Sequence, residues 1–466
     1  MNASSDFHLA RQRAAADLTT RSRVDDREPS RRAPTRRLWR EQRRPGLLCG
    51  GLALLACLAG TAVEAYPIYG SEQTGIRRLE GARLMHEGEV RGPQKRAGET
   101  LPLASVDLRL TDRPQLELPA PDPEFNREIV NLLGGRSNVY SLSVLDLSDP
   151  DNPRYAEHAA TQPRNPGSVG KIMVGLALFQ ALAEAWPEDL EARMRVLRET
   201  RVTATDFIVH DSHTVRFWDG ERRKLTRRPL RIGDQGSLFE FLDWMLSASS
   251  NAAASVVLEQ AMLLKHFGKR YPVDAETARA YFEDTPKADL SNDLEATIQA
   301  PLTRYGLDLE QLRQGSFFTR RGKQKVPGTS SYGTTRELMR LLVKMEQGKL
   351  VDAWSSRELK RLLYMTERRI RYASSPALNE AAVYFKSGSL YKCVPEPEFV
   401  CKKYHGNAMN LMNSVAIVEA PAQTRELYYI VTLTSNVLRK NSAVDHQSLA
   451  TRIHRLIERR HGADRK

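Results

Sequence analysis

Apolar and polar residues alternate along several stretches of the chain, a pattern typical of half-buried β-strands. One such stretch is "NVYSLSVLDL" (138–147), and "RYAEHAA" (154–160) follows it after a polar turn as a candidate returning strand. Three more lie near the end of the chain, at 381–391, 413–420 and 426–435. The pattern therefore predicts two strands before, and three strands after, a long central region.

The remaining apolar periodicity is helical. "NPGSVGKIMVGLALFQALAEAW" predicts a buried helix that starts near Gly167, and residues 237–262 and 334–348 repeat apolar positions at helical spacing. Further helices are expected at 121–133, where a capped start is visible, and at 446–460.

The order of these elements predicts the architecture. Residues 170–370 are mainly helical, with a polar excursion at 209–230, and the strands stand on either side of them. We therefore expect an α/β (α+β) fold, with one antiparallel five-stranded sheet flanked by helices and a second, mainly helical lobe. Residues 121–462 are predicted to form this single domain.

The chain before that domain divides into three segments. Residues 1–44 hold 12 Arg, no Lys and no apolar period, which predicts a disordered tail. Residues 45–65 are predicted to be a signal peptide or membrane anchor, because 46–63 are apolar and uncharged and small residues precede a cleavage point after Ala65. Residues 66–120 are rich in Gly, Pro and charge, which predicts a linker.

Several alternatives for this leader stay open. Cys57 ends a weak lipobox-like "LLAC", the pair Arg43–Arg44 allows a twin-arginine signal, and an uncleaved segment would anchor the chain. The long basic region before the apolar run also suggests a later start of translation, at Leu38 or Val24. Each alternative predicts export to the periplasm or to the outer face of the inner membrane.

Charge and cysteines refine this picture. The formal net charge of +13 favours anionic partners, but no zinc-finger spacing or aromatic–basic RNA signature is present, so a solvated basic surface is preferred to nucleic-acid binding. Of the four cysteines, Cys393 and Cys401 lie outside the leader. In an exported chain such a pair predicts a disulfide, the alternative being two free buried thiols.

The stretch "NPGSVGKIMV" (165–174) allows three kinds of site. A phosphate loop would need Gly where Asn165 stands and Ser or Thr where Ile172 stands, and a nucleophile elbow would need Gly in place of Pro166. The third kind fits, because Ser168 and Lys171 form S-x-x-K at the start of a buried helix. Their spacing puts both side chains on one helix face, where a desolvated Lys can take the Ser proton.

Two further motifs follow in order along the chain. Ser249 and Asn251 form S-x-N between two predicted helices, and Lys386, Ser387 and Gly388 form K-[ST]-G inside a predicted strand. The ordered set S-x-x-K, S-x-N and K-[ST]-G resembles the penicillin-recognising serine hydrolases, most closely the class A β-lactamase-like branch, over residues 120–460. "YGTTRELMRLLVKM" also looks like the Thr-Thr helix of that branch.

The resemblance implies a role for each polar residue of the first two motifs. Ser168 would be the acylated nucleophile and Lys171 its base or proton relay. Ser249 would carry a proton to the leaving nitrogen, and Asn251 would hold the amide side chain of the substrate and orient Lys171.

The third motif would bind the carboxylate of the substrate. Lys386 would supply positive charge, Ser387 a hydrogen bond, and Gly388 a close approach of the strand to the ligand. The backbone N–H groups of Ser168 and Ser389 would form the oxyanion hole.

One departure from the class A pattern bears on the reaction. The glutamate of a Glu-x-x-Leu-Asn loop, which activates water for deacylation, has no clear counterpart, and Glu310 in "EQLRQ" is a poor candidate. The expected substrates are a β-lactam or a D-alanyl-D-alanine-type stem peptide of peptidoglycan, with β-lactamase and D,D-peptidase activity both open and the peptidase favoured.

Two other classes of function remain as alternatives. The chain could be a catalytically idle peptidoglycan-binding module on the same fold, or a binder of anionic surfaces through charge alone. No metal or organic cofactor is implied, since "HDSH" (210–213) is more typical of a polar loop than of a metal site. A monomer is expected.

Overall fold

The computed structural model describes residues 70–102, 105–209 and 211–463, which all belong to the compact unit Thr61–Lys466. The predicted disordered tail (1–44) and signal peptide or membrane anchor (45–65) lie outside the described residues, and both stay predictions.

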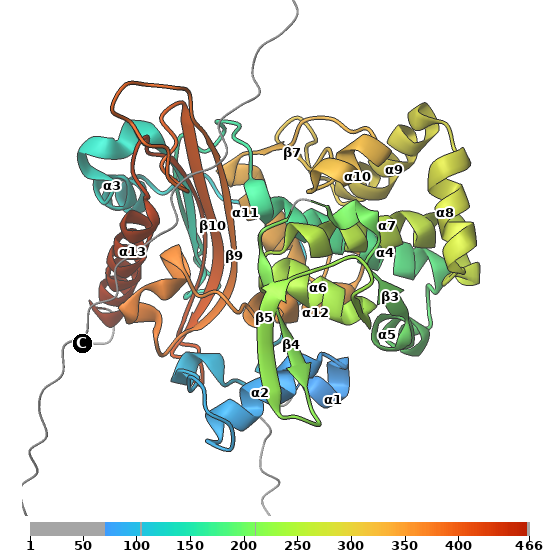
Figure 1. The fold of residues 1–466 in the computed structure, drawn as a ribbon. Coiled ribbons are helices and arrows are strands. Elements are labelled where there is room, and N and C mark those ends of the chain that lie inside the picture. The colour runs from blue at the N-terminus through green and yellow to red at the C-terminus, as the bar shows by residue number, and fades with distance from the viewer. Residues whose placement is uncertain (1–69, 103–104, 210, 464–466) are drawn as a thin grey trace, which may run out of the picture. The chain divides into compact units, whose positions relative to one another are not determined.

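A five-stranded antiparallel sheet forms one part of the fold, in the order β2-β1-β11-β10-β9 (Figure 1). This confirms the predicted sheet, and β9 stands at its edge. The strands are β1 (Tyr140–Asp146), β2 (Arg154–His158), β9 (Ala382–Lys392), β10 (Met409–Ala420) and β11 (Leu427–Asn436).

Alternate residues of these strands are buried in two different hydrophobic cores, which explains the alternation seen in the sequence. Val144 and Val431, paired in register, belong to the core that also holds residues of α3 (Pro123–Asn131) and α13 (Ala443–Ala463). Their neighbour Leu145 belongs to the core of the helical lobe. In Figure 1, α3 and α13 accordingly lie on one side of the sheet and the helical lobe on the other.

The helical lobe contains most of the remaining elements. Its helices are α4 (Lys171–Ala185), α5 (Leu190–Glu199), α6 (Leu238–Leu246), α7 (Asn251–Phe267), α8 (Ala275–Asp284), α9 (Lys287–Arg304) and α10 (Arg320–Lys325), with α11 (Thr335–Glu346) and α12 (Ala353–Tyr364) towards the sheet. Short strand pairs join β3 (Arg201–Thr203) to β6 (Gln235–Ser237), β4 (Thr214–Asp219) to β5 (Lys224–Pro229), and β7 (Leu312–Arg313) to β8 (Tyr332–Gly333).

The polar excursion within the predicted helical region is the β4–β5 hairpin. Single turns of 3₁₀-helix connect many elements: η1 (Ala97–Glu99), η3 (Gly134–Val139), η4 (Gly167–Gly170), η5 (Asp206–Ile208), η6 (Gly268–Arg270), η7 (Arg371–Ser374) and η8 (Pro376–Leu378).

The prediction that residues 66–120 form a linker is wrong for the described part of this stretch. Residues 70–102 and 105–118, here named the N-terminal arm, form α1 (Ser71–Thr74) and α2 (Arg77–His86) and pack against the rest of the unit. The arm contributes five buried side chains to the core of the helical lobe: Ile76, Leu79, Leu101, Val106 and Leu110. These apolar residues are spaced too irregularly to show a period, which is why composition alone was misleading.

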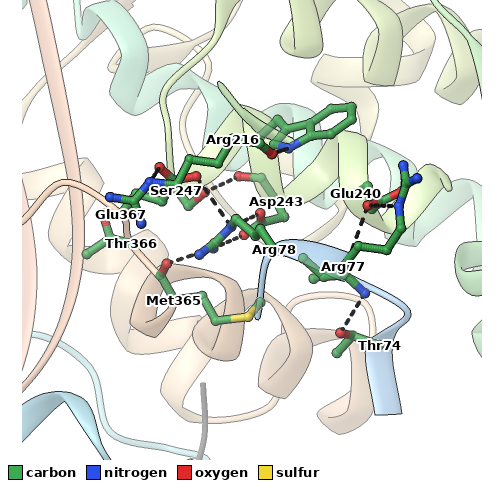
Figure 2. A network of polar contacts seen from close by, with 12 residues as sticks. Thr74, Arg77, Arg78, Arg216, Glu240, Asp243, Ser247, Met365, Thr366 and Glu367 are labelled. Atoms are coloured by element: carbon green, nitrogen blue, oxygen red, sulfur yellow. Dashed lines mark hydrogen bonds and ion pairs between the residues drawn. The ribbon is translucent and has the colours of Figure 1, made fainter. Parts of the chain in front are cut away.

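A buried polar network also holds the arm in place (Figure 2). Arg78, 4% exposed, donates two hydrogen bonds of 2.5 Å to the Asp243 carboxylate on α6 and one of 3.0 Å to the Met365 carbonyl. Its guanidinium also lies 3.3 Å from Glu367, which in turn pairs with Arg216 of β4 at 3.0 Å. The network joins four segments that are far apart in sequence.

One helical stretch of the described residues, Gly167–Ala185, is long and apolar enough by composition to cross a membrane. The structure buries 83% of that window inside the protein, so it is a core helix.

Candidate active site

Ser168 and Lys171 meet where η4 passes into α4. The Lys171 side chain is fully buried, and its Nζ lies 3.0 Å from Ser168 Oγ. The same Nζ donates hydrogen bonds of 2.7 Å to the Ser249 carbonyl and to Asn251 Oδ1. The structure thus brings together the first two predicted motifs around one amine.

These contacts fit an ammonium, which donates to all three oxygens, and they also fit a neutral amine. The carbonyl and the amide oxygen can only accept, so they take up the two N–H bonds of an uncharged Lys171. The lone pair of Nζ is then left facing Ser168, whose hydroxyl can donate to it. Burial lowers the pKa of Lys171 to about 7, an effect that the negative charge of Asp211 opposes and the nearby Arg368 reinforces.

Ser249 occupies a strained position in the short break between α6 and α7. Its φ of 62° lies in the left-handed region, which L-residues rarely adopt. The break arises because Ser250 caps α7, its hydroxyl accepting from the Ala253 N–H. As a result the Ser249 carbonyl meets Lys171, while its hydroxyl accepts a 2.8 Å hydrogen bond from Lys386 Nζ.

Lys386 comes from β9 and is buried, with its ammonium also donating to the Ser387 carbonyl at 2.9 Å. Burial, followed by the charges of Lys171, Arg371 and Arg368, lowers the pKa of Lys386 well below its usual range. These basic side chains therefore disfavour one another's charge, and an anionic ligand beside them would favour the charged form of Lys386.

Close backbone contact between η4 and β9 shapes the site. Gly167 has a φ of 54°, and a Cβ there would lie 2.8 Å from the Ser389 nitrogen. A Cβ at Gly388 would lie 2.1 Å from the Pro166 carbonyl oxygen and 3.0 Å from the Ser168 nitrogen. Both glycines are required for this close approach of η4 and β9.

A cavity of about 480 Å³ opens over these residues. Ser168, Asn251 and Ser389 line it, whereas the other predicted site residues, Lys171, Ser249, Lys386, Ser387 and Gly388, do not contribute to its lining. The structure does not test the predicted roles of any of these eight residues, and all of them stay predictions. The lining also includes residues that the sequence did not single out as functional: His213, Gln314, Phe317, Phe318, Lys323, Lys403 and Tyr404.

Asp211 and His213, from the "HDSH" stretch, support the loop that carries Asn251. Asp211 accepts from the Ser250 hydroxyl at 3.0 Å and from the Ala252 N–H at 2.8 Å, and its other oxygen lies 2.6 Å from His213 Nδ1. Burial alone would raise the pKa of Asp211, but its hydrogen bonds hold the pKa far below the usual range. Within the described residues no group of three or more His, Cys, Asp or Glu could hold a metal ion.

No Asp or Glu is among the described residues that line the cavity. Glu310 is exposed and is not part of the lining. Gln314 is buried at 3% exposure and donates to the Ser316 carbonyl at 2.6 Å. Its Oε1 packs against Gly170, where a Cβ would lie 2.1 Å from it, so a neutral amide occupies the space beside the Ser168 helix turn.

A disulfide joins Cys393 and Cys401 in the connection between β9 and β10, with 6.2 Å between the Cα atoms. The same connection places Lys403 and Tyr404 against the cavity. Arg371 stacks over the Tyr404 ring at 5.6 Å and donates to the Gly388 carbonyl. Tyr404 also packs edge to face on Tyr391 of β9 at 6.0 Å, so this connection contacts the K-S-G strand.

One protein-family model matches this chain. This model is described as the beta-lactamase enzyme family, and it matches residues 124–457, more than half of the chain. The structure is similar to that of PBP-A, at 14% identity over 74% of this chain and 100% of the other, with a TM-score of 0.47. It is also similar to a beta-lactamase from Chitinophaga pinensis, at 15% identity over 72% and 96% of the two chains with a TM-score of 0.44. A beta-lactamase from Sphaerobacter thermophilus is similar at 12% identity, over 70% of this chain and 93% of the other, with a TM-score of 0.43. A search among curated proteins finds no match.

Proposed function

Since this chain belongs to the beta-lactamase enzyme family, we propose that it is an active-site serine hydrolase that forms an acyl-enzyme on Ser168. Its substrates are β-lactams or D-alanyl-D-alanine-type peptide amides, and its acyl-enzyme from a β-lactam is long-lived. The observation that carries the proposal is the 3.0 Å contact between Ser168 Oγ and a buried Lys171 whose pKa is lowered to about 7.

Acylation begins with proton transfer from Ser168 to Lys171. Neutral Lys171 takes the hydroxyl proton while Oγ attacks the carbonyl carbon of the substrate amide. In this proposal the negative oxygen that forms accepts hydrogen bonds from the N–H groups of Ser168 and Ser389, and the close approach of Gly167 to β9 supports that arrangement. The positive charge of Lys171 stays beside the developing anion.

The leaving nitrogen needs a proton as its bond to the carbonyl carbon breaks. The Ser249 hydroxyl gives that proton, and Lys386, whose Nζ lies 2.8 Å away, replaces it. Lys386 must be charged for this step. The carboxylate of the bound substrate keeps Lys386 charged, because an anion beside Lys386 raises the pKa of this lysine again.

Deacylation lacks an evident base. Among the described residues of the cavity lining no carboxylate can take a proton from water, and Gln314 cannot do so. Lys171 is protonated after acylation and must lose that proton before it can act as a base. We therefore expect slow hydrolysis of a β-lactam ester.

Intact mass spectrometry of the full-length protein tests the proposal. Penicillin G is a suitable probe, since it is the ligand named for the acyl-enzyme complex of a PBP-A variant. The wild type should gain the mass of one penicillin G and keep it. Ser168→Ala should gain none, and Ser330→Ala, which removes another hydroxyl of the same cavity, should behave as the wild type.

Each other result has a distinct meaning. A transient adduct with consumption of penicillin G would identify a β-lactamase, in which a group other than a cavity-lining carboxylate activates water for deacylation. Release of D-alanine from an acyl-D-alanyl-D-alanine peptide would identify the peptidase. No adduct and no release would contradict the proposal and leave a binding module that does not react.

We further propose that the protein acts outside the cytoplasm. The apolar segment 46–63 and the Cys393–Cys401 disulfide support export, because disulfides persist in oxidising compartments. Cell fractionation with N-terminal sequencing of the mature chain tests this, and a reduced, unprocessed cytoplasmic protein would contradict it.

A further inference from the structure

A second cavity, of about 460 Å³, lies within the helical lobe. Residues of β3, η5, α7 and α8 line it, and it shares no lining residue with the active-site cavity. The catalytic scheme above uses none of its side chains.

The wall contributed by α7 carries a buried carboxyl group. Glu259 is 4% exposed, and both of its oxygens lie 3.1 Å from a single donor, the Thr205 hydroxyl. Burial raises the pKa of Glu259 to about 8. A carboxylate can accept several hydrogen bonds, so one hydroxyl leaves most of its capacity unused, and a desolvated charge without a counter-ion is costly.

No ion pair to Glu259 occurs in the part of the chain that the structure describes. The cationic side chains that line the cavity are instead engaged elsewhere, in the pairs Lys325–Asp206 (2.9 Å), Arg279–Glu283 (2.7 Å) and Arg201–Glu240 (4.0 Å). Glu259 is thus the acidic side chain of this cavity lining that has no cationic partner among the described residues. A cation bound beside it would favour the ionised carboxylate and so lower its pKa again.

Aromatic rings form the apolar part of the wall. Phe207 and Phe282 pack edge to face, with 4.9 Å between their ring centroids, and Tyr271 is held by a 2.8 Å hydrogen bond to Gln260. Lys325 Nζ lies 5.1 Å from the Phe207 ring centroid, so one cation of the protein already contacts this ring.

We propose that this cavity binds a small organic ammonium, with its cationic end paired to Glu259 and its apolar body against Phe207 and Phe282. An ammonium supplies the two things that the carboxyl of Glu259 lacks, which are a positive charge and hydrogen-bond donors. The ring faces favour the same charge and bury the apolar part. A neutral ligand would leave the carboxylate without an opposite charge, and an anion would be repelled by it.

Isothermal titration calorimetry on the full-length protein tests this with three probes that differ in one group: benzylammonium, benzyl alcohol and benzoate. Benzylammonium should bind at least about tenfold more tightly than the alcohol, and benzoate should not bind. Glu259→Gln keeps the shape of the side chain and should weaken benzylammonium about tenfold. Glu283→Gln removes a rim carboxylate and should change the affinity by less than about twofold.

Equal affinity for benzylammonium and benzyl alcohol, or an unchanged affinity in Glu259→Gln, would overturn the proposal, as would no binding of benzylammonium at millimolar concentration. Thermal unfolding should show that both variants are folded. Phe282→Leu offers a second check, since loss of the ring should weaken benzylammonium more than the alcohol. Ser168→Ala should bind benzylammonium as tightly as the wild type does. The test of this cavity is therefore independent of the test of the acyl-enzyme.

Discussion

The Nζ atom of Lys171 lies 3.0 Å from the Oγ atom of Ser168, and its two other contacts are to oxygens that cannot donate a proton. The residues that hold this amine, Ser249 and Asn251, are about eighty positions away in the sequence. Burial at that point favours the neutral amine. The geometry and the lowered pKa of Lys171 therefore both support its proposed role as a base.

The first prediction concerns pH. At saturating penicillin G, the rate constant for acylation should rise about tenfold per pH unit below pH 7 and level off above it, because only neutral Lys171 accepts the proton. Stopped-flow or quenched mass spectrometry over pH 5–9 measures this profile. An inflection near the ordinary lysine value, or a flat profile, would contradict it, and Lys171→Met should remove acylation at every pH.

Two adjacent serines should differ in their effects. Ser249→Ala removes the hydroxyl beside Lys386 and should slow acylation by penicillin G about 10²–10⁴-fold, with little effect on unfolding. Ser250→Ala removes the cap of α7 and should cost about 1 kcal/mol of unfolding free energy. Measuring both quantities for both variants separates the roles, and equal effects on acylation would contradict the proton shuttle.

A carboxylate at position 314 should speed deacylation. Gln314 lines the cavity beside the Ser168 turn, so Gln314→Glu places a base where hydrolytic water must approach. We expect the penicillin G adduct of this variant to decay about tenfold faster or more, followed by intact mass. The matched control is Gln324→Glu, which adds the same charge on the exposed face of α10 and should leave the lifetime unchanged.

The close backbone contact between Gly388 of β9 and Pro166 should be essential for acylation. A Cβ there meets the Pro166 carbonyl oxygen at 2.1 Å, so Gly388→Ala must push β9 away from η4. Acylation should fall at least about a hundredfold as the oxyanion contacts separate. Gly135→Ala, where a Cβ meets nothing within 4 Å, should keep the wild-type rate, and normal acylation in Gly388→Ala would refute the proposed arrangement.

Removing Arg78 should test whether the N-terminal arm belongs to the folded unit. Arg78→Met leaves Asp243 buried without its partner and should lower the unfolding free energy by about 3–5 kcal/mol. Arg83→Met, on the same helix, removes a surface pair with Glu87 and should cost only a few tenths of a kcal/mol. Denaturant unfolding measures both, and equal small losses would indicate that the arm contributes little.

Local pattern accounts for the parts of the fold that the sequence alone predicted. The alternation at 138–147 and 381–391 reflects a sheet whose two faces are buried in different cores, and the S-x-x-K spacing places Ser168 and Lys171 one turn apart. The order of the three motifs was also sufficient to indicate the family. The N-terminal arm was not predictable in this way, because its core residues gain their burial only from contacts with distant segments.

Periodicity, spacing and residue type were therefore determined by the sequence itself, since each depends on neighbours within a few turns or strands. The tertiary structure decided which of those residues are buried away from solvent and which charged groups lie close together. It buried Lys171 among acceptors from a distant segment and placed the amide of Gln314 beside Gly170, in the turn that carries Ser168. It also enclosed Glu259 without a counter-ion among the described residues. Desolvation and long-range electrostatics depend on the complete three-dimensional packing, which is why these properties cannot be obtained from the order of the residues alone.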